Sequence, residues 1–200
     1  MLVRRGDRRG VWVESPEIRR RLQGDFLLGR ACGLRRGYPQ RILDATAGLG
    51  VDGLALALAG AQVDLVERDA VLWALLHNLL ERLEIPGVEL TRGDAGKILA
   101  GDTCWDVVYF DPMFPARGKT ALPGKRMQYL AALLGKGDAF DQPLLAAARE
   151  KATARVVLKR RLKDTPLADP DWSIRGRSVR YDVYRGRASG PGAAERAPGE

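Results

Sequence analysis

The motif DPMF at Asp111–Phe114 contains residue types that can hold and orient an aromatic amine. It follows the apolar run Trp105–Phe110, which is typical of a strand buried on both faces. An exocyclic amine is a poor nucleophile because its lone pair is delocalised into the ring. The Asp111 carboxylate and the Pro112 carbonyl can accept its two N–H bonds, and Phe114 can stack on the ring. We therefore predict that Asp111, Pro112 and Phe114 are catalytic residues.

A second candidate site is the stretch Arg41–Glu67, whose pattern predicts a strand, a glycine loop, a helix and a second strand. The first strand ends at Asp44, the loop holds Gly48 and Gly50, and the second strand ends at Glu67. Glycines let a ligand approach the backbone, and a helix start offers unpaired N–H groups. An acidic side chain at the end of the second strand can accept hydrogen bonds from ribose hydroxyls. The stretch therefore predicts a nucleotide-binding unit.

The residues around these glycines favour one kind of nucleotide. Gly48, Gly50 and Gly53 satisfy the GxGxxG pattern, which also suits NAD enzymes. In dinucleotide-binding folds the first glycine follows the strand almost at once, whereas here Ala45–Ala47 intervene after Asp44. Asp44 can face the ammonium group of S-adenosylmethionine, and the pair Asp94-Ala95 can read an adenine edge. Both features fit S-adenosylmethionine better than NAD.

Strands alternate with helices along most of the chain. The expected strands are Arg41–Asp44, Gln62–Glu67, Val88–Thr91, Trp105–Phe110 and Ala154–Lys159. The expected helices are Glu17–Leu22, Val51–Ala59, Ala70–Leu83, a short helix to Leu99, one near Arg126–Leu134, and Gln142–Thr153. Ser173–Arg175 and Ser178–Arg185 can form a closing hairpin. This order predicts an α/β fold with a doubly wound, mostly parallel sheet and a C-terminal antiparallel hairpin.

The composition divides the chain into three parts. Residues 1–40 are a predicted basic N-terminal extension, because residues 1–41 contain eleven Arg and four acidic residues. Residues 41–186 carry the regular pattern and form the predicted catalytic domain. Residues 187–200, rich in Gly, Ala and Pro, are expected to be disordered.

The net charge of +8 favours a polyanionic partner. Basic residues without an acid among them also follow the DPMF motif, and four of these are predicted to bind RNA phosphates: Arg117, Lys119, Lys125 and Arg126. The alternative is a solvated, arginine-rich surface. With one histidine and two isolated cysteines, no metal site is expected. No apolar run reaches the ~20 residues of a membrane span, so a cytoplasmic protein is expected.

Asp111-Pro112-Met113-Phe114 resembles the Asp-Pro-Pro-Tyr/Phe signature of methyltransferases that act on amino groups. Longer blocks resemble the RsmJ-type guanine-N2 methyltransferases of bacterial small-subunit ribosomal RNA: DATAGLGVDGLALA from Asp44, VERDAVLWALL from Val66, VVYFDPMFPARGKTALPGKRMQ from Val107, and ARVVLKR from Ala154. The ending RYDVYRG from Arg180 is similar in kind.

The resemblance implies a Rossmann-like class I methyltransferase that transfers a methyl group from S-adenosylmethionine to a guanine N2 of ribosomal RNA. By matching position it implies cofactor contacts from Asp52, Glu67, Arg68, the pair Asp94-Ala95, and Asp111. The partner would be small-subunit ribosomal RNA or the assembled small subunit.

Other functions stay open at this point. The same fold and cofactor could serve DNA adenine, transfer RNA or a protein glutamine as acceptor. An NAD-linked oxidoreductase is disfavoured by the residues between Asp44 and Gly48. A non-catalytic RNA-binding module would not need Asp111 and Pro112.

Overall fold

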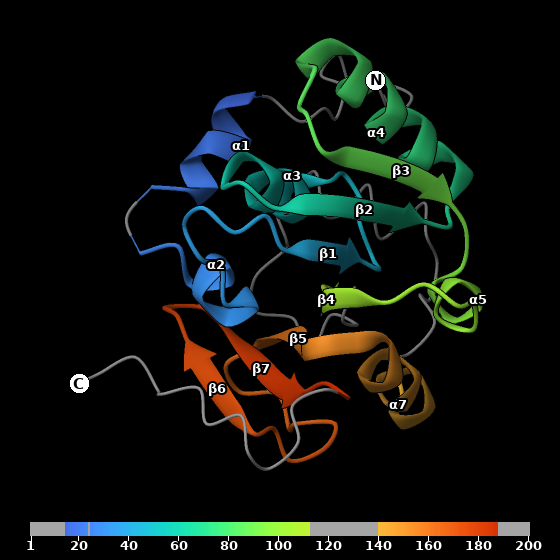
Figure 1. Cartoon of the computed structure of the whole chain (residues 1–200). Coiled ribbons are helices and arrows are strands. Elements are labelled where there is room, and N and C mark those ends of the chain that lie inside the picture. Colours follow the sequence, from blue (N-terminus) through green and yellow to red (C-terminus); the bar gives the residue numbers. More distant parts are fainter. Residues whose placement is uncertain (1–14, 24, 113–139, 188–200) are drawn as a thin grey trace, which may run out of the picture.

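The computed structural model describes residues 15–23, 25–112 and 140–187 of the chain. These residues contain a seven-stranded sheet of order β3-β2-β1-β4-β5-β7-β6 (Figure 1). The strands are β1 (Arg41–Asp44), β2 (Gln62–Glu67), β3 (Val88–Arg92), β4 (Trp105–Phe110), β5 (Ala152–Arg161), β6 (Trp172–Arg175) and β7 (Val179–Arg185). Pairs from β3 to β5 are parallel, whereas β7 and β6 add antiparallel strands. The predicted fold class is therefore confirmed.

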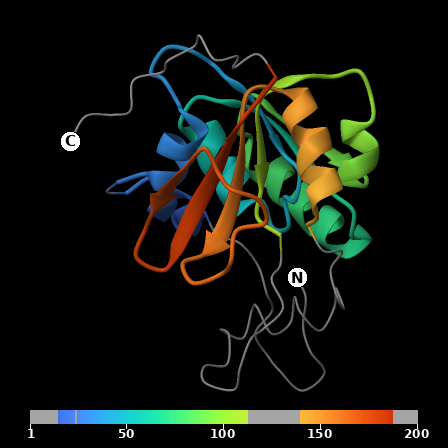
Figure 2. The same ribbon diagram turned by 90° about the horizontal axis from the view of Figure 1, so that it is seen from below.

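Helices cover both faces of the sheet. They are α1 (Ser15–Arg21), α2 (Leu27–Cys32), α3 (Val51–Leu58), α4 (Ala70–Leu83), α5 (Ala95–Leu99) and α7 (Gln142–Lys151). Residues of α1 to α4 share one buried cluster with one face of the sheet, and residues of α5 and α7 share a second cluster with the other face. Figure 2 shows α1, α2 and α3 on one side of the sheet and α7 on the opposite side. No helix in the described ranges is long and apolar enough to cross a bilayer.

Alternation along the buried strands decides which side chains meet which helices. In β4, Val107 and Tyr109 belong to the cluster beneath α1 to α4, whereas Val108 and Phe110 belong to the cluster beneath α5 and α7. All four side chains are fully buried, as expected for a central parallel strand. A residue two positions beyond Tyr109 therefore faces the α3 side of the sheet.

Several predicted boundaries differ from the structure, most clearly those around β5. The expected helix Gln142–Thr153 ends at Lys151, and β5 already begins at Ala152. Ala152 is fully buried and pairs with Trp105 of β4, so sheet pairing overrides its helical propensity. At the other end β5 reaches Arg161 because that residue pairs with Val179 of β7. The expected helix near residues 126–134 lies outside the described residues, and so does the expected disordered segment 187–200 apart from Arg187.

The first two helices pack against the rest of the fold. Ile18 of α1 and Leu28 of α2 are 1% and 3% exposed and belong to the same buried cluster as α3. The division of the chain after residue 40 stays a prediction.

The sheet order places a ligand-binding position between β1 and β4. The chain passes from β1 to β2 on one side and returns to β4 on the other side. In open α/β sheets a crevice forms at such a reversal, outside the carboxyl ends of the strands. The residues that end β1 and β4 are therefore the first candidates for a functional site.

Candidate active site

Three acidic residues lie at the carboxyl ends of neighbouring parallel strands: Asp44 ends β1, Glu67 ends β2, and Asp111 follows β4. The residues two positions before them belong to the buried cluster beneath α1 to α4: Ile42, Leu65 and Tyr109. Because side chains alternate along a strand, all three acids are on the α3 side of the sheet. The structure thus brings together acids that are up to 67 positions apart in the sequence.

The glycine loop between β1 and α3 contacts Glu67. Gly48 and Gly50 both have left-handed backbone conformations, with φ of 57° and 77°. The N–H of Gly48 donates to Glu67 Oε2 at 2.8 Å, and the N–H of Asp69 donates to Glu67 Oε1 at 2.8 Å. Burial raises the pKa of Glu67, although these N–H groups favour the charged form. Glu67 therefore holds the loop and the end of β2 together.

The three glycines of the GxGxxG pattern serve different purposes. A Cβ on Gly50 would lie 2.5 Å from Leu76 Cδ1, so this glycine lets α4 pack closely. A Cβ on Gly53 would lie 2.7 Å from Asp44 Oδ2, so this glycine lets α3 approach β1. A Cβ on Gly48 would meet only the Thr46 carbonyl oxygen, at 4.0 Å. Of the three, Gly48 is the glycine with open space beside it.

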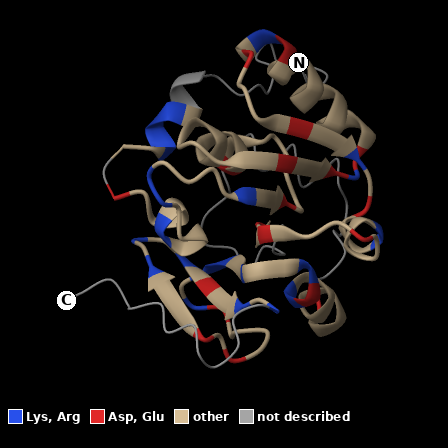
Figure 3. Ribbon diagram, viewed as in Figure 1, with Lys and Arg blue, Asp and Glu red and all other residues tan. Residues whose placement is uncertain are grey.

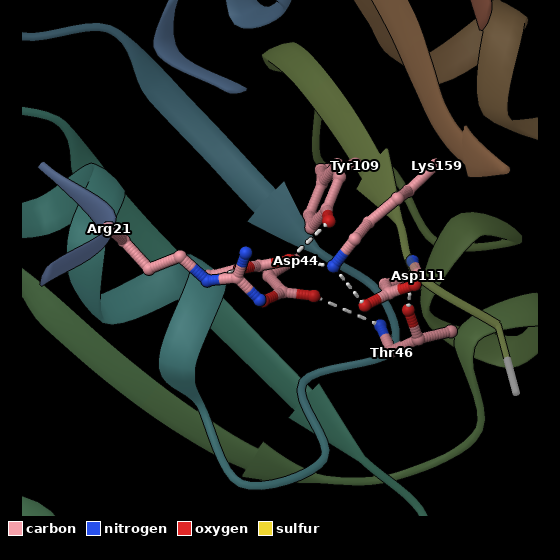
Figure 4. Close-up of polar contacts among 7 residues, drawn as sticks. Arg21, Asp44, Thr46, Tyr109, Asp111 and Lys159 are labelled. Atoms are coloured by element: carbon pink, nitrogen blue, oxygen red, sulfur yellow. Dashed lines mark hydrogen bonds and ion pairs between the residues drawn. The ribbon is translucent and has the colours of Figure 1, made fainter. Parts of the chain in front are cut away.

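Thr46 links the ends of β1 and β4. Its hydroxyl accepts a hydrogen bond from the Asp111 N–H at 2.7 Å, and its own N–H donates to Asp44 Oδ1 at 3.3 Å. The backbone at Asp111 is therefore held in place from the glycine loop (Figure 4).

A buried ion-pair network lies beside Asp111. Lys159 of β5 places its Nζ 2.6 Å from Asp52 Oδ2 and 2.7 Å from Asp111 Oδ2 (Figure 4). The Tyr109 hydroxyl donates to the same Asp52 oxygen at 2.7 Å. Arg21 of α1 approaches Asp52 Oδ1, with Nε at 3.1 Å, but this contact lacks hydrogen-bond geometry. Four elements, α1, α3, β4 and β5, therefore meet at Asp52.

Burial and charge set the protonation states in this network. Burial disfavours the Lys159 ammonium, but Asp52 and Asp111 outweigh it and raise the pKa of Lys159, so Lys159 is charged. Burial also opposes ionisation of Asp52, but Lys159 and Arg21 outweigh it and lower the pKa of Asp52. The pKa of Asp111 is raised by burial and by repulsion from Asp52, which Lys159 only partly offsets. Of the two acids that share Lys159, Asp111 is therefore the easier to protonate.

The two acids also differ in exposure. The Asp111 side chain is 38% exposed, whereas the Asp52 side chain is 8% exposed. Of these two acids, Asp111 is therefore the one that an incoming acceptor can reach. Tyr109 is fully buried, and burial together with the nearby carboxylates raises its pKa well above the ordinary value. Its hydroxyl remains protonated and keeps donating to Asp52.

Other predicted site residues have separate positions. Asp94 caps α5, because its Oδ1 accepts from the Lys97 N–H at 3.1 Å, and Ala95 begins that helix. Arg68 is exposed after β2. Pro112 directly follows Asp111 and is half-buried. Phe114, Arg117, Lys119, Lys125 and Arg126 lie outside the described residues, so their roles stay predictions.

Sequence reasoning missed four residues of the site: Lys159, Tyr109, Thr46 and Arg21. Lys159 had a signal, because it directly follows the buried apolar run Val156–Leu158, where a charge needs a partner. The partner itself had no local signal, since Asp52 is 107 positions away.

Comparisons with known proteins show the family of this chain. Residues 12–186 match the protein family described as “Putative SAM-dependent methyltransferase”. The chain belongs to this family. It is 45% identical over 175 residues to ribosomal RNA small subunit methyltransferase J of Alkalilimnicola ehrlichii, covering 80% of this chain and 66% of the relative. It is 40% identical over 198 residues to the protein of the same name from Pseudomonas aeruginosa, covering 90% of this chain and 75% of the relative.

A solved structure agrees with the fold of this methyltransferase. The crystal structure of a SAM-dependent methyltransferase from Neisseria gonorrhoeae has a TM-score of 0.72 and 27% sequence identity. The match covers 96% of this chain and 81% of that chain. S-adenosylmethionine is therefore the cofactor of this methyltransferase.

The residues of the site fit this cofactor. Gly48 leaves open space beside a left-handed backbone, and Glu67 and Asp44 end the strands on both sides of that loop. Asp52 Oδ1 is buried and lies 3.1 Å from Arg21 Nε, so this oxygen is already in an ion pair. When bound, the cofactor supplies an electrophilic methyl group on a sulfonium sulfur. The individual cofactor contacts stay predictions: Asp44, Gly48, Gly50, Asp52, Glu67, Arg68, Asp94, Ala95 and Asp111.

Proposed function

We propose that this methyltransferase methylates the exocyclic N2 amine of a guanine in small-subunit ribosomal RNA. The observation that carries the proposal is the position of Asp111 and Pro112 at the carboxyl end of β4, beside the reversal between β1 and β4. The names of the relatives support small-subunit ribosomal RNA as the substrate. The protein would act in the cytoplasm, on free RNA or on the assembled subunit.

The residues of this chain would orient the acceptor amine. Asp111 and the Pro112 carbonyl would accept its two N–H bonds, which directs the nitrogen lone pair toward the methyl group. As the N–C bond forms and the S–C bond breaks, the electron pair of the broken bond stays on sulfur and positive charge develops on nitrogen. The Asp111 carboxylate would stabilise that charge. The amine proton becomes acidic only during this step, so a strong base is unnecessary.

A basic surface beside the site also supports a polyanionic substrate. We call it the arginine edge: Arg161, Lys163, Arg175 and Arg177, all exposed. Arg175 pairs with Arg180 of β7, which pairs with Arg160 of β5, so the β6–β7 turn lies at the same end of the sheet as Lys159. Two strand spacings separate β5 from β6, which is about 10 Å. Figure 3 shows basic residues on the β6–β7 hairpin and on α1.

The decisive experiment compares wild-type protein with Asp111→Ala. We expect the variant to lose methyl transfer to small-subunit ribosomal RNA by roughly 10²-fold or more, because the amine loses its oriented acceptor. Binding of S-adenosylhomocysteine, measured by calorimetry, should change much less. Mass spectrometry of digested RNA would identify the methylated nucleoside. Asp102→Ala, an exposed substitution elsewhere, is the matched control.

The same assay separates the alternative acceptors. Free small-subunit RNA, assembled small subunits, transfer RNA, adenine-containing DNA and a glutamine-containing protein would each be offered with labelled S-adenosylmethionine. N2-methylguanine in ribosomal RNA supports the proposal. Full activity in Asp111→Ala, or transfer confined to another acceptor, would overturn it.

A further inference from the structure

Lys159 is a charged residue in a strand that is otherwise buried. Its side chain is 10% exposed, and Val156, Val157 and Leu158, the residues before it in β5, are fully buried. Its register partner on β7 is Tyr181, which is also buried. A lysine in such surroundings loses its proton unless an acid stabilises the ammonium. The strand therefore carries a charge whose cost of burial must be offset by its contacts.

Those contacts join two acids from different elements. Asp52 is on α3, and its Oδ2 accepts hydrogen bonds from Lys159 Nζ and from the Tyr109 hydroxyl. Asp111 follows β4, and its Oδ2 accepts a hydrogen bond from Lys159 Nζ at 2.7 Å. Asp52 thus fixes the ammonium from the buried side, and the ammonium in turn holds the more exposed acid.

We propose that Lys159 is a positioning residue for methyl transfer, which holds the Asp111 carboxylate by Oδ2 so that Oδ1 can accept the N–H of the acceptor amine. The inference rests on the proposed function, because it gives Asp111 the role of orienting an amine. Two hydrogen bonds hold Asp111 within the described residues: its N–H to Thr46 and its Oδ2 to Lys159. The first fixes the backbone and the second fixes the rotation of the side chain.

The ammonium also favours the charged form of Asp111, which is the form that the chemistry needs. A protonated Asp111 would offer one acceptor fewer and could not stabilise charge on the amine. Lys159 is already protonated, so it does not take the proton that the amine loses. That proton leaves through Asp111 or solvent after the N–C bond has formed.

A merely structural role must be separated from this one, because removing Lys159 alone takes one of two cations away from the buried Asp52 and leaves only Arg21 to offset its charge among the described residues. The informative pair is therefore Asp52→Asn against Asp52→Asn with Lys159→Met. Both variants lack the Asp52 charge, and they differ in the charge of Lys159 and its two contacts, with Asp111 and with the side-chain oxygen at position 52. Thermal unfolding and calorimetry with S-adenosylhomocysteine show whether both variants fold and bind the cofactor.

We expect the double variant to have a kcat at least about tenfold lower than Asp52→Asn at neutral pH. The KM for S-adenosylmethionine should be similar in both. Loss of the ammonium raises the pKa of Asp111, so the acid limb of the kcat profile should move to higher pH. The other titratable groups that act on Asp111 are the same in both variants: Arg21 on α1, Asp44 on β1, Tyr109 on β4 and Tyr181 on β7.

A second readout needs no substrate. The Asp111 carboxyl group can be titrated by carbon NMR in both variants, and Lys159→Met should raise its pKa. An unchanged titration of Asp111 together with an unchanged kcat profile would overturn the inference. If wild-type protein methylates no ribosomal RNA, the proposed function fails, and the NMR titration still tests whether Lys159 controls Asp111. As single substitutions, Lys159→Arg should retain more activity than Lys159→Met, since arginine keeps the charge.

Discussion

At the end of β1, the Asp44 carboxyl group is 2% exposed, and its Oδ1 accepts a hydrogen bond from the backbone of Thr46. Burial, with added repulsion from Asp52, raises the pKa of Asp44 from 3.8 to about 8. Between these two values the folded protein holds a proton that the unfolded chain has lost. The free energy of unfolding therefore falls as pH rises through this window.

Replacement of Asp44 by Asn removes this titration and keeps an oxygen acceptor for Thr46. We expect Asp44→Asn to gain stability relative to wild type as pH rises from about 5 to about 8. Urea unfolding at both pH values measures this difference. The exposed substitution Asp102→Asn should follow the wild-type pH dependence. If Asp44→Asn also follows it, Asp44 does not hold a proton in the folded protein.

At the level of elements, the loop between β1 and α3 has two glycines with similar backbone angles and different surroundings. Gly50 faces Leu76 of α4, whereas Gly48 has open space beside it. The loop therefore packs against the core at Gly50 and leaves room for a ligand at Gly48.

Alanine at each position tests this division. Gly48→Ala should cost about 1–2 kcal/mol, because alanine is strained in the left-handed region. Gly50→Ala should cost about 1–3 kcal/mol more, because its Cβ would collide with Leu76. For its smaller effect on stability, Gly48→Ala should weaken S-adenosylhomocysteine binding more than Gly50→Ala does. Denaturant unfolding and calorimetry measure both quantities, and equal unfolding costs would contradict the assignment.

Across the whole molecule, charged residues gather at the carboxyl ends of the parallel strands. Acids end β1, β2 and β4, Lys159 lies near the end of β5, and the arginine edge continues along the β6–β7 hairpin. The arginine edge lies at the same end of the sheet as Asp111, on β5 and on the hairpin beyond it, so we expect it to contact phosphates that flank the acceptor nucleotide.

The double variant Arg175→Ser with Arg177→Ser tests this surface. We expect weaker RNA binding and a slope of log affinity against log salt that is smaller by about 1–2, since two phosphate contacts are lost. Cofactor binding and thermal stability should not change. Arg82→Ser with Arg187→Ser removes the same charge from exposed positions on α4 and beside the amino end of β5. Equal losses in both double variants would mean that net charge alone attracts the RNA.

The sequence by itself determined the strands, the glycine loop, the acids at strand ends and the resemblance to a methyltransferase family. These depend on local patterns: alternation, helical periodicity, turn residues and short motifs. Only the tertiary structure decided that Lys159 joins Asp52 and Asp111, residues that lie 107 and 48 positions away along the chain. The physical reason is that their meeting depends on the sheet order β1-β4-β5 and on which face each strand turns toward α3. A lysine in an apolar run indicates a buried partner, but the fold selects which acid it is.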